Sequence, residues 1–172
     1  MASALLLAAL ALADPVAPPI ALDALFDFSD PAHCVPAPAF QAVLDKLWGW
    51  SSGQQAPLAP EPYRAAFGQV TRIARNNGGV VMSVSIQGSW QGLAVTGIDI
   101  SRPPGEARGF QLVFRAPAEK VAATLAPLGF EETTMKVRAD TGELSAPTPR
   151  LVPQGDLTAL RCPLPTVKAH HD

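Results

Sequence analysis

Histidine is scarce in this sequence of 172 residues, which has only His33, His170 and His171. No histidine-dependent catalytic triad or zinc motif can therefore lie in the central part of the chain. The sequence also has no G-x-S-x-G nucleophile motif, no phosphate-binding glycine loop and no C-x-x-C pair. Nothing in it positively indicates an enzyme; we expect no cofactor and favour a non-catalytic protein, with an enzyme kept as the alternative.

The apolar stretch Ala4–Leu12 is only nine residues long, whereas crossing a bilayer as a helix takes about 20. It lies in residues 1–13, which carry no charged side chain and end in Ala11-Leu12-Ala13, the A-x-A pattern of a signal-peptide cleavage site. We predict a signal peptide over residues 1–13 and a periplasmic or secreted mature chain without a transmembrane anchor. The segment lacks the usual Lys or Arg, and the alternative is an apolar N-terminal helix of a cytosolic protein.

Charge is also scarce, since 13 Lys and Arg against 15 Asp and Glu give a formal net charge of -2. Residues 1–62 are acidic and residues 63–172 mildly basic, an asymmetry too weak to indicate nucleic-acid binding. We expect no nucleic-acid partner. The only hint of an anion site is a set of arginines in the basic part: Arg64, Arg72, Arg75 and Arg115.

Cys34 and Cys162 are the only cysteines, and in an oxidising compartment two cysteines most often form one disulfide. We predict this bridge, which would connect the two ends of the fold. The alternative is a reactive thiol at Cys34, just ahead of a predicted helix and next to His33.

The predicted bridge would hold His33 near the tail that contains His170, His171 and Asp172. Imidazole and carboxylate ligands of this kind suit zinc, copper or nickel. Chain ends, however, commonly carry solvated side chains. We predict no metal site and keep this group of four as the alternative.

Proline divides the chain, because half of its 18 prolines lie from Pro15 to Pro62 and none lies from residue 63 to 102. Proline removes a ladder hydrogen-bond donor, so a sheet should form where it is absent. We predict an extended arm over residues 14–38 and a single α+β domain over residues 39–172, with a Pro-rich linker at 53–62. Apolar residues in the arm should pack on the domain.

Apolar residues at helical spacing predict a helix from Phe40 to Trp48, ended by Gly49. Residues 68–75 fit either a helix or a strand, and we favour a strand, followed by a loop over residues 76–79. A turn is expected at Gly88-Ser89. The remaining predicted elements are strands Val80–Gln87, Trp90–Ile100 and Phe110–Arg115, a helix from Pro117 to Leu128, and strands Phe130–Arg138 and Leu157–Cys162.

These elements predict an α+β fold with an antiparallel sheet of about five to six strands and two helices packed on one face. The order along the chain is α-β-β-β-β-α-β-β. One sheet face, rich in Ser, Gln, Thr and Arg, would stay open, as solvated surface in the simplest interpretation. Trp48, Trp50 and Trp90 should mostly fill the core, although exposed aromatic residues can also anchor a partner.

Two functional interpretations remain. The first is a non-catalytic binding protein of the cell envelope, with a protein or cell-wall partner bound at a sheet face or edge. The second is a small secreted enzyme that uses clustered carboxylates, such as Asp99 and Glu106, or an arginine-lined anion pocket.

The signal-peptide prediction can be tested by N-terminal sequencing of the exported protein. We expect the sequence to begin at Asp14, because cleavage follows Ala11-Leu12-Ala13. Recovery of the chain with Met1 intact would contradict the predicted signal peptide.

Overall fold

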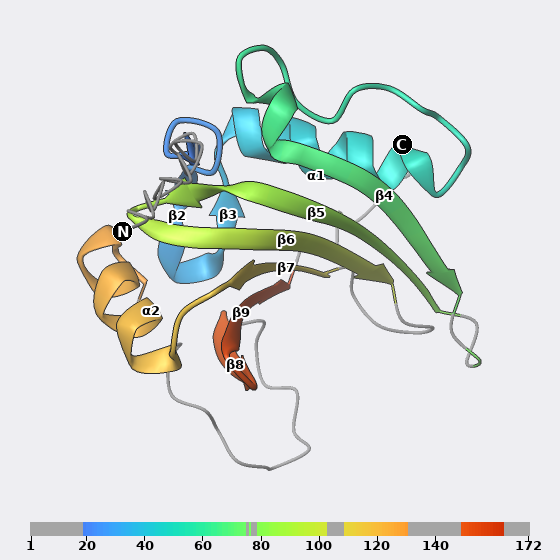
Figure 1. The fold of residues 1–172 in the computed structure, drawn as a ribbon. Coiled ribbons are helices and arrows are strands. Elements are labelled where there is room, and N and C mark those ends of the chain that lie inside the picture. Colours follow the sequence, from blue (N-terminus) through green and yellow to red (C-terminus); the bar gives the residue numbers. More distant parts are fainter. Residues whose placement is uncertain (1–18, 75, 77–78, 103–108, 131–148, 164–172) are drawn as a thin grey trace, which may run out of the picture.

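The computed structural model of the chain describes residues 19–74, 76, 79–102, 109–130 and 149–163. These residues form a mixed seven-stranded sheet in the order β1-β5-β6-β7-β9-β8, with β4 also paired to β5 (Figure 1). Its strands are β1 Ile20–Ala21, β4 Phe67–Ala74, β5 Val80–Trp90, β6 Leu93–Arg102, β7 Gly109–Phe114, β8 Arg150–Gln154 and β9 Leu157–Pro163. All pairs are antiparallel except β1 with β5. The predicted α+β class is confirmed, and the order of its elements broadly so.

The hairpin of β5 and β6 turns later than the sequence predicts. The turn expected at Gly88-Ser89 is wrong, because both residues pair with β6. The chain instead turns at Gln91 and Gly92, whose φ values are 51° and 72°. Positive φ at two successive residues is the geometry of a tight type I′ hairpin.

The core-facing side of β6 changes halfway along the strand. Leu93 and Val95 belong to the core near its start, and Ile98 and Ile100 near its end, although odd and even positions of a regular strand face opposite sides. The pairing with β7 shifts register between Val95 and Gly97, as at a β-bulge. Simple alternation along this strand therefore fails at the shift.

The last hairpin is only partly predicted. The expected strand Leu157–Cys162 is present as β9, but its partner β8, which contains Pro153, was not among the expected strands. Proline is tolerated there since β8 is an edge strand. The expected strand Phe130–Arg138 lies outside the described residues apart from Phe130, which is buried. In the ambiguous segment 68–75, the strand is confirmed over residues 68–74, which belong to β4, while residue 75 lies outside the described residues.

Two helices cover the same face of the sheet, as predicted (Figure 1). α1, Pro38–Trp50, begins with a proline in its first turn, a favourable position. It continues past Gly49, which we expected to end it. α2, Ala118–Leu125, leads into a short 3-10 turn, η3, Ala126–Leu128. Within the described segments, no helix is long and apolar enough to span a membrane. The buried residues of the two helices are Phe40, Val43, Leu44, Leu47, Val121 and Leu125.

The described part of the predicted arm packs on the sheet. Its first strand, β1, runs parallel to the end of β5, a pairing we did not expect. This close approach needs glycine at position 88, since a Cβ there would lie 2.6 Å from Leu22 Cδ1 and 2.8 Å from the Ile20 carbonyl oxygen. The predicted signal peptide, residues 1–13, lies outside the described residues and stays a prediction.

A small antiparallel pair follows in the arm: β2, Phe28–Asp30, and β3, Val35–Pro36, joined by the 3-10 turn η1, Pro31–His33. Phe28 enters the core, where its ring centroid lies 5.5 Å from that of Phe40 and 5.8 Å from that of Trp90. The arm thus fills the centre of the core. Trp90 is 2% exposed, which confirms that it fills the core, while Trp48 and Trp50 are half-buried.

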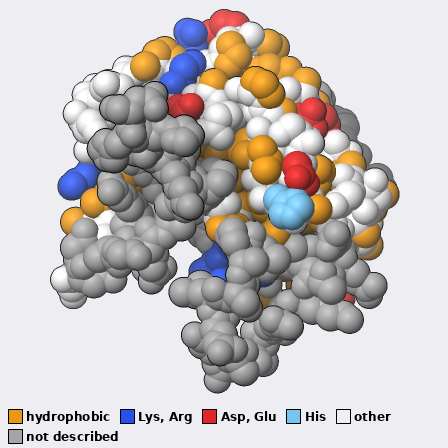
Figure 2. Space-filling view, turned by 180° about the vertical axis from the view of Figure 1, so that it is seen from behind, with side chains coloured by type: hydrophobic (Ala, Val, Ile, Leu, Met, Phe, Trp, Pro, Cys, Tyr) orange, Lys and Arg blue, Asp and Glu red, His pale blue; other side chains and the backbone are white. Residues whose placement is uncertain are grey.

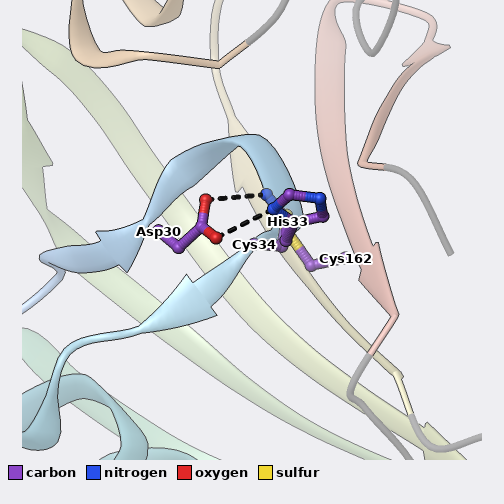
Figure 3. Close-up of a disulfide and its surroundings, with 4 residues drawn as sticks. All are labelled: Asp30, His33, Cys34 and Cys162. Carbon is purple, nitrogen blue, oxygen red and sulfur yellow. Dashed lines mark hydrogen bonds and ion pairs between the residues drawn. A yellow bond between two sulfur atoms is a disulfide. The ribbon is translucent and has the colours of Figure 1, made fainter.

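The predicted disulfide joins Cys34, just after η1, to Cys162 in β9, with a Cα–Cα distance of 5.6 Å (Figure 3). Both cysteines are buried. The linker 53–62 has no helix or strand, as expected, yet Leu58 and Ala59 within it are buried. Arm, linker and sheet therefore share one core.

The disulfide closes a loop across a sequence separation of 128 residues. In the chain-entropy model, closing a loop of this size stabilises the folded protein by about 5 kcal/mol. Urea unfolding of the double variant Cys34→Ala/Cys162→Ala should therefore show a free energy of unfolding several kcal/mol below that of the oxidised protein.

Reductant should destabilise the wild-type protein and leave the double variant unchanged, which separates the loss of the bridge from the loss of side-chain packing. Equal stability of the oxidised and reduced wild-type protein would contradict a stabilising role for the bridge.

Candidate functional site

His33 lies on the surface beside the disulfide, at the end of η1 (Figure 3). Its Nδ1 is 2.8 Å from Asp30 Oδ2, and its backbone N–H donates to Asp30 Oδ1 at 3.3 Å. The side chain is 73% exposed, and Figure 2 shows a histidine in pale blue beside acidic side chains. Its other proposed metal-binding partners, residues 170–172, lie outside the described residues. The residues that the structure describes contain no group of three or more His, Cys, Asp or Glu side chains that could hold a metal ion.

The reactive-thiol alternative for Cys34 is wrong for the oxidised protein. Its sulfur is bonded to that of Cys162, and its side chain is fully buried. A disulfide sulfur carries no thiolate, and burial prevents access to a substrate. Cys34 is a structural residue.

The arginines singled out in the sequence do not come together. Arg64 forms an exposed ion pair with Glu61 at 3.0 Å, and Arg75 lies outside the described residues. Arg72 lies within the paired part of β4 and β5, opposite Met82. Arg115 follows the end of β7, which is three strands away from β4. Strand spacing and rise place their Cα atoms roughly 20 Å apart. The three of these arginines that the structure describes therefore form no common anion site.

A different set of polar residues forms a continuous row across the sheet face opposite the helices. Each of six neighbouring strands contributes one residue, and each residue is the register partner of the next. Since register partners project from the same face of a sheet, all six side chains share the outward face. We call this row the polar ladder; its members, from β4 to β8, are Thr71, Ser83, Asp99, Gln111, Arg161 and Arg150.

Hydrogen bonds connect the middle of the polar ladder. The Asp99 carboxylate accepts from the Ser83 hydroxyl through one oxygen and from the Gln111 amide Nε2 through the other. Gln111 Oε1 in turn accepts from Arg161 Nε at 3.1 Å. Both ends of the Gln111 amide are thus committed, which fixes its orientation and that of the Arg161 guanidinium group.

A shallow hollow of about 600 Å³ lies on this outward face. Thr71, Ser83 and Asp99 of the polar ladder line it. The other lining residues include Gln69, Ser85, Thr96, Val113, Gln154 and Leu157. Because residues of both β4 and β8 contribute, the hollow extends across much of the width of the sheet.

The chemistry of the hollow is that of hydrogen bonding. Its lining presents hydroxyl and amide groups together with apolar side chains, and Asp99 is its one ionisable residue among those described. Both oxygens of Asp99 already accept hydrogen bonds from neighbours. General acid–base catalysis needs a group positioned to exchange a proton with substrate, so this arrangement suits binding better than proton transfer. Glu106, the other carboxylate considered, lies outside the described residues.

The sequence indicated an open polar sheet face but not the ladder on it. Arg150 was missed because β8 was not predicted, and with it the pairing of Arg150 with Arg161 of the predicted strand Leu157–Cys162. The available signal was Gly155-Asp156, a hairpin-type dipeptide that follows Gln154 and has a glycine with φ of 68°.

Comparison of the chain with protein families, with curated proteins and with solved structures finds no match.

Asp99 should contribute measurably to stability, because it is the acceptor for two partly buried neighbours. Asp99→Ala should lower the free energy of unfolding by about 1–3 kcal/mol, since hydrogen bonds to a charged group are lost and their donors stay without a partner. The control is Ser85→Ala in the same hollow, whose side chain is exposed and makes no hydrogen bond within the described segments. Equal stability of the two variants in urea would show that the ladder contacts are energetically neutral.

Proposed function

We propose that the protein is a non-catalytic binding protein of the cell envelope and that its partner lies on the outward face of the sheet. The observation that carries this proposal is the polar ladder beside the hollow. Paired strands hold each ladder residue, and the hydrogen bonds orient the side chains before a partner arrives. Preorganisation of this kind reduces the entropy lost on binding.

The location rests on two features of the sequence and fold. Residues 1–13 have the pattern of a secretory signal, and a disulfide joins Cys34 to Cys162. Disulfides persist in oxidising compartments such as the periplasm or the extracellular space. Both features support a periplasmic or secreted protein.

The shape of the hollow favours a partner with an extended surface, such as a protein or a cell-wall polymer. Small-molecule pockets usually enclose most of the ligand, whereas this hollow is shallow and open. Its hydroxyl and amide groups would bind a polar partner by hydrogen bonds. The alternative, a small secreted enzyme, has no observation in its favour among the described residues.

Site-specific photo-crosslinking in the intact envelope tests which face binds. A photoreactive residue at Gln154, which is exposed and lines the hollow, should give a discrete crosslinked product. The same residue at Lys46, exposed on α1, should give none, because α1 covers the opposite face. Crosslinking from Lys46 and not from Gln154 would contradict the proposed binding face.

A further inference from the structure

Two arginines stand directly opposite each other at the end of the polar ladder. Arg150 of β8 and Arg161 of β9 are register partners, and both are exposed. Opposed residues in an antiparallel pair have Cβ atoms about 5 Å apart, and like charges in this arrangement destabilise the sheet. Such a pair costs stability unless something else compensates the two positive charges.

No carboxylate of the described residues compensates these charges. The ion pairs found there are His33 with Asp30 and Arg64 with Glu61. Asp99, the ionisable group of the hollow, lies two ladder positions from Arg161, about 10 Å at ordinary strand spacing. Gln111 fills the position between them.

The guanidinium group of Arg161 is already oriented. Its Nε–H donates to Gln111 Oε1, and the Gln111 amide is held by Asp99. A guanidinium group has five N–H donors, so the four on the two Nη atoms remain for a ligand. A planar group held in this way is suited to bidentate binding of an oxyanion.

We propose that Arg150 and Arg161 together bind a phosphate group of the ligand that occupies the outward face. A phosphate monoester carries a charge of about -1.5 to -2 near neutral pH and three acceptor oxygens, which matches two guanidinium groups. A single carboxylate carries one negative charge, which is half of the charge that balances two guanidinium groups. The rest of the ligand extends along the ladder towards the hydroxyl and amide groups of the hollow. This inference rests on the proposed function and adds the chemistry of the ligand to it.

The test is a titration of the oxidised mature protein, followed by NMR, with glucose 1-phosphate, inorganic phosphate and acetate at constant ionic strength. Both phosphates should shift the resonances of β8 and β9 saturably, and acetate should not. A stronger response to the sugar phosphate than to inorganic phosphate identifies a phosphate-bearing ligand that also contacts the hollow. An equal response identifies the phosphate group alone as the ligand.

Arg150→Gln and Arg161→Gln should each weaken phosphate binding about tenfold or more, because each removes charge-assisted hydrogen bonds. Gln111→Leu should weaken it less, by releasing the Arg161 side chain. The matched control is Arg115→Gln, which removes an exposed arginine just beyond β7 and should leave binding nearly unchanged. Circular dichroism checks that each variant is folded.

The proposal is overturned if acetate and phosphate act alike, if Arg115→Gln weakens binding as much as Arg161→Gln, or if phosphate causes no saturable shift. Absence of phosphate binding together with crosslinking from Gln154 would remove this inference and leave the proposed binding face. Phosphate binding together with crosslinks only from Lys46 on α1 would remove the proposed binding face and leave the phosphate site at Arg150 and Arg161.

Discussion

The covering of one sheet face by the N-terminal third of the chain is the constraint on which the rest of the structure depends. The arm and α1 supply the apolar side chains that fill the core against β5, β6 and β7, with Phe28 in contact with aromatic residues from both the helix and the sheet. The buried disulfide fixes the arm to β9. Because the helices and the bridge all lie on this face, the opposite face stays uncovered by them and carries the polar ladder.

The polar ladder then follows from strand register. Thr71 and Arg150 are far apart in sequence, yet unbroken pairing from β4 to β8 places them in one row. The register shifts in β5 and β6 lie beyond Ser85 and Gly97, nearer the hairpin turn. The bulges therefore reshape the far end of the sheet and leave the ladder intact. The apolar core and the face that we propose as a binding site therefore lie on opposite sides of the same strands.

The spacing of apolar residues predicted those helices and strands whose formation depends mainly on residues close in sequence. The apolar stripe of α1 and the strands around Met82 and Leu112 follow from residue spacing. The disulfide is a long-range contact, but it could be predicted because the chain has only two cysteines. The failures involve contacts between distant segments. Gly88 resembles a turn residue in sequence, but it is required because Leu22 packs against it. The strand β8 was not predicted, and it can contain Pro153 because it lies at the edge of the sheet. The polar ladder depends on strand pairing between distant segments, so the sequence indicated a polar face but not its organisation.

The central claim is that the outward face is a preorganised site and not merely solvated surface. The most direct measurement is hydrogen exchange of the arginine side-chain Nε–H groups, observed by NMR in the ligand-free protein. Arg161 Nε–H should exchange markedly more slowly than that of Arg115, because it donates to Gln111 within the ladder, and Asp99→Asn should remove the difference. Equal exchange rates for the two arginines in the wild-type protein would contradict the claim.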